Sequence, residues 1–254
     1  SGLQCYPTHG GGHLRPSLVA PDSAIPRADL AIYRALGAMA TAITGYPTIS
    51  VYEEFTPDPS QARTGSLMQW SYDEMGIITF STELWNPELA AGIEHPAFYQ
   101  VRGRSREDEI KLLAYNDEHL GGKGFVNWTP FNHPQLGPVE IGGWTHMYTF
   151  RNPPPESYAV TDKARSFLRE TIHNNCLFTL KHAACTPLLR ILTTVVEPVG
   201  GDLYKLRVTV GNQGYLPTYL TERALERATV TPVKVTLRLP EGVELIMGSL
   251  TQEL

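Results

Sequence analysis

GIITFSTELW, residues 76–85, is a short apolar run that carries a single carboxylate, Glu83. Runs of about four to eight apolar residues that follow a glycine are typical of strands buried on both faces. We therefore predict a buried strand over residues 76–84, with an acidic side chain at its end. Burial disfavours the charged form of a carboxyl group and raises its pKa, which suits a group that must exchange protons near neutral pH.

Helical patterns lie on both sides of this strand in the sequence. Apolar residues recur every three or four positions, which predicts helices over residues 29–43, 105–119 and 161–184. The predicted inward face of the third helix consists of Ala164, Leu168, Ile172 and Phe178. A second buried strand is expected over residues 138–141. Strands mixed with helices indicate an α/β domain over residues 1–186.

The pattern changes after Pro187. Apolar residues alternate with polar ones over residues 204–210 and again over 233–239, which predicts half-buried strands. We expect residues 188–254 to form a small β-sandwich-like accessory domain. The region stops without a clear closing strand, as a truncated sandwich would.

Composition excludes some classes of function. The net charge is −5 and charged residues make up 19% of the chain, so no basic surface for nucleic acid is predicted. No apolar run reaches the roughly 18 residues of a membrane span. The three cysteines lack CxxC spacing, which argues against a disulfide framework. The chain begins with Ser1, and we expect its natural start to lie upstream.

Three blocks follow one another along the chain, and they read THGGGHLRP at 8–16, SVY at 50–52 followed by GSLMQWSY at 65–72, and GIITFSTELW at 76–85. Together they resemble the carboxypeptidase A-like family of zinc metallocarboxypeptidases. The resemblance implies the C-terminal portion of the catalytic domain, in which helices flank a mixed sheet. A looser likeness beyond residue 86 is similar to a bacterial-type branch of the family that carries an extra β-domain.

The resemblance implies chemical roles for individual side chains. Glu83 matches the catalytic glutamate, which takes a proton from a zinc-bound water and delivers it to the leaving amine. Tyr52 matches the tyrosine that closes over the bound substrate, and Thr8 falls among the substrate-binding positions. From the residues alone, Glu140 is the rival general base, because it lies in an apolar run followed by two glycines.

The zinc position departs from the family pattern. The expected histidine falls on Pro7, which offers no donor atom, and the family's other two zinc ligands form a His-x-x-Glu pair that would lie upstream. His9 is the substitute ligand to consider, since it shares a strand face with position 7 and lies about 7 Å further along. His13 occupies an apolar position of the family and is predicted to be packed. Zinc is therefore implied by the resemblance, with an incomplete site in this chain.

The leading hypothesis is a zinc-dependent metallocarboxypeptidase that removes residues from the C-termini of peptides or proteins, once the upstream ligands are present. The alternative, motivated by Pro7, is a metal-free and catalytically inactive relative that binds peptides. A third hypothesis gives the β-domain a role in adhesion or docking. The resemblance favours a secreted or periplasmic location.

Overall fold

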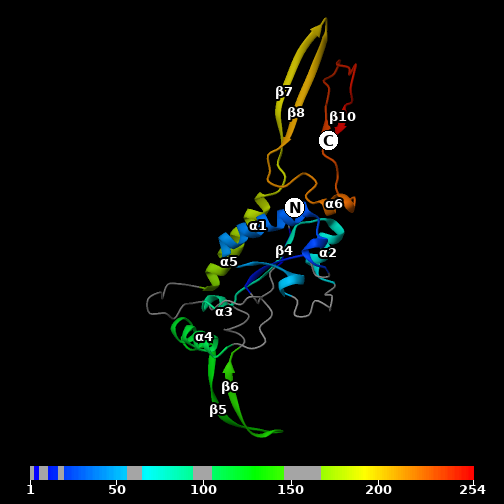
Figure 1. Ribbon diagram of the computed structural model, residues 1–254. Helices are drawn as coiled ribbons and strands as arrows, with labels where there is room; N and C mark the ends of the chain where they lie inside the picture. Colours follow the sequence, from blue (N-terminus) through cyan, green and yellow to red (C-terminus); the bar gives the residue numbers. More distant parts are fainter. Residues whose placement is uncertain (1–2, 6–10, 17–19, 56–64, 94–104, 146–166) are drawn as a thin grey trace.

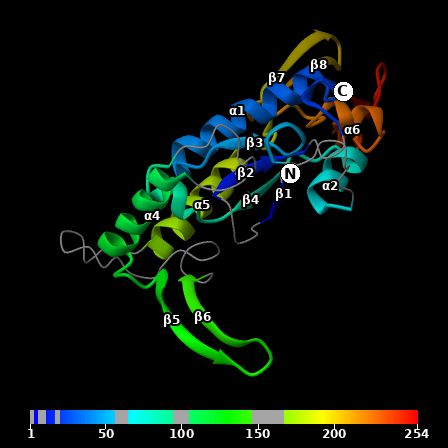
Figure 2. The ribbon, with the colours of Figure 1, turned by 60° about the horizontal axis from the view of Figure 1, so that its bottom comes forward.

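A four-stranded mixed sheet forms the centre of the protein (Figures 1 and 2). The structure is a computed structural model that describes residues 3–5, 11–16, 20–55, 65–93, 105–145 and 167–254. The strands run in the order β1 (Leu3–Cys5), β4 (Thr79–Glu83), β2 (Gly12–Arg15) and β3 (Thr48–Ser50). β1 is parallel to β4 and β3 is parallel to β2, whereas β2 and β4 are antiparallel. The coarse α/β prediction is confirmed, and the predicted strand over 76–84 is found as β4.

Helix α1 (Arg27–Thr44) lies against the sheet and confirms the helix predicted over 29–43. It follows Pro26, and it ends where Gly45 adopts a left-handed conformation with φ 75°. Glycine is favoured at this position because it has no Cβ to clash. The face of α1 that carries Tyr33, Leu36 and Ala40 is buried.

The main hydrophobic core joins α1, β4 and α5 (Phe167–Ala184). Phe80 of β4 is fully buried and meets the rings of Tyr33 and Phe178 edge-on, with centroids 5.4 and 5.7 Å apart. Edge-to-face contacts of this kind add to the free energy gained by burying the rings. Leu216, far along the chain, belongs to the same core. Because these rings come from three elements, the core fixes both helices on one face of the sheet.

The buried face of α5 differs from the prediction. Leu168 and Ile172 are 38% and 50% exposed, and Ala164 lies outside the described residues. The buried positions are instead Phe167, Thr171, Asn175, Phe178 and His182. Three of these are polar, and packing tolerates them because they find partners: the Asn175 amide donates to the Thr171 carbonyl at 2.8 Å, and His182 stacks on Phe178. Contacts with α1 and β4, rather than apolar content, set the orientation of this helix.

The opposite face of the sheet carries a smaller core, whose members are Leu14, Ile49, Val51, Phe55 and Met68. They come from β2, β3, the π-helix η2 (Val51–Phe55) and helix α2 (Leu67–Met75). α2 starts at Ser66, whose hydroxyl accepts the Gln69 amide at 3.3 Å, and ends at Gly76. Gly76 has φ 64°, and a Cβ there would lie 2.4 Å from Ala224. Only glycine allows this close approach between α2 and the C-terminal region.

A second group of elements extends from one end of the sheet: α3 (Pro87–Ala90), α4 (Arg106–His119), β5 (Phe125–His133) and β6 (Gly137–Trp144). β5 and β6 form an antiparallel hairpin that projects away from the sheet (Figure 1). The predicted strand over 138–141 is present as part of β6, but the prediction that it is buried is wrong, because most of its residues face solvent. A two-stranded ribbon without a covering layer leaves both faces exposed.

Residues 188–254 contain β7 (Leu189–Gly200), β8 (Leu203–Asn212), α6 (Glu222–Glu226), β9 (Lys234–Thr236) and β10 (Thr251–Glu253). β7 and β8 form a long hairpin, which projects from the end of the molecule opposite to β5 and β6 (Figures 1 and 2). β9 and β10 form a separate antiparallel pair. The predicted strands over 204–210 and 233–239 are found as β8 and β9, in two separate two-stranded sheets. The prediction that the first of them is half-buried is wrong, because residues 204–209 are exposed on both faces of the hairpin.

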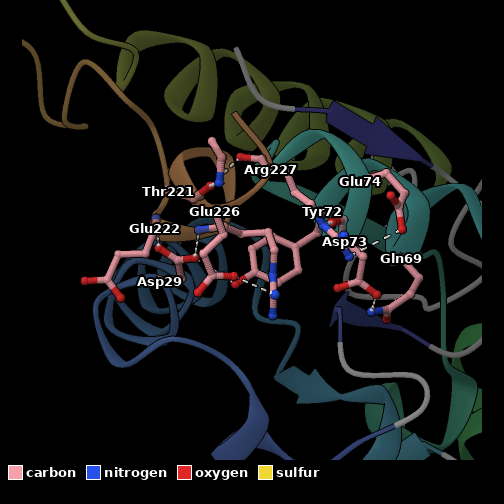
Figure 3. Close-up of polar contacts among 12 residues, drawn as sticks. Asp29, Gln69, Tyr72, Asp73, Glu74, Thr221, Glu222, Glu226 and Arg227 are labelled. Carbon is pink, nitrogen blue, oxygen red and sulfur yellow. Dashed lines mark hydrogen bonds and ion pairs between the residues drawn. The ribbon is translucent and has the colours of Figure 1, made fainter. Parts of the chain in front are cut away.

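A buried carboxylate joins this C-terminal region to the main domain (Figure 3). Asp29 of α1 is fully buried and accepts the Tyr72 hydroxyl at 2.8 Å. It also accepts the backbone N–H groups of Glu222 and Arg223, at 2.7 and 3.1 Å, at the start of α6. The Thr221 hydroxyl donates to the Gly76 carbonyl at 2.6 Å. These bonds satisfy polar groups that would otherwise be costly to bury, so α1, α2 and α6 are held together at one point.

Candidate functional site: the end of strand β4 and the neighbouring cavity

Glu83 is the last residue of β4, and its side chain is 4% exposed. Its Cα lies opposite Gly12 of β2, a residue without a side chain to cover it. β1 runs parallel to β4 and ends at Cys5, beside Ser81. Both parallel strands therefore end at the same edge of the sheet. Side chains alternate along a strand, so Glu83 lies on the face opposite to Phe80 and Thr82.

His13 lies on the other face and is fully buried. Its Nδ1 lies 2.8 Å from the Thr82 hydroxyl and its Nε2 lies 2.7 Å from the Thr44 hydroxyl. Burial lowers the pKa of His13 to about 4, so the ring is neutral at pH 7. A neutral imidazole with both nitrogens paired to hydroxyls serves packing, and the prediction that His13 is packed is confirmed.

The sheet separates Tyr52 from Glu83. Tyr52 is a half-buried residue of η2, which follows the last residue of β3. That last residue, Ser50, pairs with Arg15, whereas Glu83 pairs with Gly12 at the other end of β2. Three residues of strand span about 10 Å. The two residues that the resemblance places on one substrate therefore leave the sheet at opposite ends.

Glu140 lies far from this edge, on the projecting hairpin. It is exposed, and its Cα pairs with Pro130 of β5. The interpretation that made it a rival base depended on a buried position, which β6 does not provide. Pro7, Thr8 and His9 lie outside the described residues.

The described residues do not fit a zinc ion by themselves. Structural and catalytic zinc sites use three or four protein ligands drawn from His, Cys, Asp and Glu. In the described part of the chain, no three such residues gather closely enough to hold a metal ion. Any zinc held beside Glu83 would need donors from beyond these residues.

Arg15 and Asp22 form a buried ion pair on the α1 face of the sheet. Their side chains are 7% and 9% exposed, and both guanidinium NH₂ groups bond the carboxylate. Arg34 adds a longer contact of 3.5 Å to the same carboxylate. Because each charge is neutralised by its partner, this pair ties β2 to the short helix η1 (Asp22–Ala24) and has a structural role.

A cavity of about 410 Å³ opens two residues beyond Glu83, where the chain leaves β4. Its volume falls within the roughly 300–1,000 Å³ of ligand pockets. The described part of the wall contains aromatic rings, an imidazole, amides, hydroxyls and the carboxylate of Glu170. The described lining residues are Thr44, Gly45, Tyr46, Trp85, Asn86, Leu89, Ala90, Tyr115, His119, Phe167, Glu170, Thr171, Asn174 and Asn175.

Trp85 is the most constrained residue of this cavity. It has φ 63°, a left-handed conformation that costs a non-glycine residue roughly 1–2 kcal/mol. Its backbone N–H donates to the Tyr46 hydroxyl at 3.0 Å. Its side chain is buried, and the indole Nε1 has no hydrogen-bond partner among the described residues. The wall of the cavity therefore contains a strained backbone and a buried donor that no described residue accepts.

The sequence predictions missed this cavity. Its lining comes from α1, the end of β4, α3, α4 and α5, which span residues 44–175. One local signal is present in the sequence: Asn86-Pro87 after Trp85 is a helix start, and the Asn86 side chain caps α3 by accepting two backbone N–H groups. That signal locates the turn after β4, but it does not indicate which residues of the other elements line the cavity beside this turn.

Residues 188–254 match the family described as Domain of unknown function (DUF8731). The match begins one residue before β7, so it covers both C-terminal two-stranded sheets and α6 but none of the central sheet. No curated protein matches the chain. Within the described residues, no helix has the length and apolar character needed to cross a bilayer.

Proposed function

We propose that this chain contributes the C-terminal portion of a metallocarboxypeptidase-type domain, which hydrolyses the last peptide bond of peptides or proteins. The observation that carries the proposal is Glu83: a carboxylate 4% exposed, at the end of a strand where its parallel neighbour also ends. The carboxyl ends of parallel strands are common positions for active sites in α/β folds. The order of the motifs along the chain supports the same proposal.

In this proposal Glu83 moves protons. The carboxylate accepts a proton from the attacking water and then donates it to the amine that leaves, so that it returns to its starting state. Gly12, the β2 residue opposite Glu83, carries no side chain that could cover the carboxylate. The zinc implied by the resemblance is assigned to donors beyond the described residues, and Tyr52 is assigned to substrate closure only by the resemblance.

We also propose that residues 188–254 form the β-sandwich-like module. Paired residues of the β7–β8 hairpin separate into an apolar face and a polar face. The apolar face contains Ile191, Val196, Tyr204, Leu206 and Val208, all at least 36% exposed. An isolated two-stranded hairpin is marginally stable in water, so a second layer over this face would stabilise it.

The test of the peptidase proposal is a matched pair of substitutions in the full-length protein. Glu83→Gln keeps the size of the side chain but removes its ability to exchange protons, and release of the C-terminal residue from a blocked peptide is expected to fall by more than 10²-fold. Glu140→Gln is the control, because that carboxylate is exposed on the distant hairpin. Equal activity of wild type and Glu83→Gln would reject the assignment. A large loss in Glu140→Gln alone would move it to the hairpin.

A second candidate function is a metal-free relative that binds peptide C-termini without cleaving them. It is favoured by Pro7, which stands where the resemblance expects a zinc ligand. Elemental analysis of the purified full-length protein separates the two candidates. One zinc per chain would contradict the metal-free relative, whereas absence of metal together with measurable peptide binding would support it.

A further inference from the structure

The outer edge of β7 is an open strand edge in the described part of the chain. β7 contains 12 residues, all exposed, and its partner in the two-stranded sheet is β8. An edge strand presents a row of backbone N–H and C=O groups that can pair with a further strand. An isolated hairpin is marginally stable in water, whereas three or more strands with an apolar face can be stable. A further strand on this edge would therefore stabilise the hairpin that projects in Figure 1.

A bulge in β7 determines which of its side chains share a face. Arg190 and Glu197 are seven positions apart, which would place them on opposite faces of a regular strand. Their partners on β8 are Gly211 and Lys205, which are six positions apart, because the register shifts at Leu192. Arg190 and Glu197 therefore lie on the same face of the hairpin, and both residues are exposed.

We propose that β7 pairs with β7 of a second copy of this chain, antiparallel and about a twofold axis at Thr194. Counted past the bulge, this register places Arg190 opposite Glu197 of the second copy, and the symmetry repeats the pair with the roles exchanged. Opposite charges that face each other across antiparallel strands stabilise the pairing, and like charges destabilise it. Charge complementarity therefore argues for a second copy as the partner and selects this register.

The same register continues the apolar face of the hairpin. Ile191 falls opposite Val196 of the second copy, and these side chains are 68% and 59% exposed in the single chain. The result is a sheet in the order β8, β7, β7, β8, with one continuous apolar face. A slip of one residue would set the apolar face of one copy beside the polar face of the other. Charge and hydrophobic pattern therefore select the same pairing.

The length of β7 also suits this pairing. Pro198 follows Glu197 and has no backbone N–H, which confines proline in sheets to edge strands and strand ends. A second register shift follows Pro198. Counted past both shifts, Gly200 of the second copy falls opposite Leu188, the residue directly before β7. The two strands therefore overlap along their full length, and the turn of each hairpin ends beside the start of the other.

This inference goes beyond the proposed function, because pairing through β7 needs neither Glu83 nor a metal. β7 lies within residues 188–254, the region that matches the family of unknown function. The pairing uses the edge of the hairpin, whereas the second layer of a sandwich would cover its apolar face. Self-association is thus a role for this region that is independent of hydrolysis.

Sedimentation velocity of the full-length protein measures the association directly. Between about 1 and 100 μM the wild type is expected to shift from monomer to dimer, since a contact between two strands is a small interface and small interfaces are commonly weak. A wild type that stays monomeric at about 100 μM would overturn the proposal. Glu83→Gln is expected to dimerise as the wild type does, so failure of the peptidase proposal would leave this one standing.

Charge reversals test the register. Arg190→Glu and Glu197→Arg each convert both ion pairs into like-charge contacts, and each variant alone is expected to dimerise at least about 10-fold more weakly. In an equimolar mixture, one variant brings two carboxylates and the other brings two guanidinium groups. Both ion pairs then form again, so the mixture is expected to recover a dimer with nearly the wild-type Kd. A mixture that associates no better than its components would overturn the proposal.

Arg207→Glu is the matched control. Arg207 is exposed on the same face, but it belongs to β8 and lies away from the open edge of β7. Its reversal is expected to leave the Kd within about twofold of the wild-type value. Far-ultraviolet circular dichroism checks that all three variants are folded. Equal weakening by Arg207→Glu and Arg190→Glu, or wild-type dimerisation of all three variants, would place the contact elsewhere and overturn the proposal.

Discussion

Replacement of Asp29 should loosen the attachment of the C-terminal region. The Asp29 carboxylate is fully buried and accepts three hydrogen bonds, from the Tyr72 hydroxyl and from two backbone N–H groups of α6. Asp29→Ala removes all three acceptor contacts at once. Each buried donor left unpaired costs about 1–3 kcal/mol, so the free energy of unfolding is expected to fall by about 3–6 kcal/mol after partial relaxation.

Graded variants separate the contributions. Tyr72→Phe removes one donor together with its bond and should cost about 1 kcal/mol. Asp29→Asn keeps one acceptor oxygen but directs an amide at neighbouring donors, and it should cost an intermediate amount. Glu74→Gln is the control, because its ion pair with Arg227 spans 3.6 Å between exposed side chains and such pairs are worth about 0–1 kcal/mol.

The assay is urea unfolding followed by tryptophan fluorescence and by far-ultraviolet circular dichroism. Limited proteolysis of the folded variants adds a local measurement, since detachment of α6 should expose residues 213–229 to cleavage before the rest of the chain. If Asp29→Ala lost less than about 1 kcal/mol, as expected for the Glu74→Gln control, the carboxylate would not be the point of attachment, and the reasoning would be refuted.

Three further predictions concern stability. Burial lowers the pKa values of His13 and His182 to about 4, below the value of about 6.5 in the unfolded chain. The stability that depends on their neutral rings is therefore fully present above pH 6.5 and is lost as the pH falls toward 4. Each histidine should lower the free energy of unfolding by about 2 kcal/mol between pH 7.5 and 5, measured by urea unfolding at the two pH values. Phe178→Ala should cost about 3–5 kcal/mol in the same assay, because the ring is fully buried between α1 and β4; a loss below about 1 kcal/mol would contradict this packing. Val196→Asp should cost about 2 kcal/mol or more if a second layer covers the apolar face of β7–β8, whereas Thr193→Asp on the polar face should change stability by less than about 0.5 kcal/mol; equal effects would reject the sandwich.

Local patterns predicted the elements that are regular over several residues. The helix over 29–43 was predictable because one apolar face recurs through Tyr33 and Leu36 and a glycine ends it. The strand over 76–84 was predictable because both of its faces are buried in the sheet. In each of these segments the local distribution of apolar residues indicates both the conformation and the burial.

Tertiary contacts decided what the patterns could not. On α5 the apolar residues Leu168 and Ile172 face solvent, while Thr171 and Asn175 are buried beside the cavity. The buried face of α5 includes polar residues that form hydrogen bonds, so a search of the sequence for an apolar stripe does not find this face. α2 went unpredicted, although Ser66 and Gly76 cap it as the sequence rules describe.

The candidate site was predictable only in part. Glu83 was singled out by its motif and by its place at the end of an apolar run, and the structure places it in a buried position at the sheet edge. The separation of Tyr52 from Glu83 follows from strand direction, because β3 runs parallel to β2 and therefore away from the end of β4. The sequence of a single strand does not show whether that strand runs parallel or antiparallel to its neighbours in the sheet. The cavity around Trp85 is lined by residues from five elements, so it could not be predicted from the sequence either.

The most direct test of the central proposal is the rate at which the full-length protein releases the C-terminal amino acid from an N-blocked dipeptide, compared between wild type and Glu83→Gln. Measurable release by the wild type is expected, with a loss of more than 10²-fold in the variant and unfolding free energies that agree within about 1 kcal/mol. Equal rates in the two folded proteins, or no release by a wild type that contains stoichiometric zinc, would contradict the proposal.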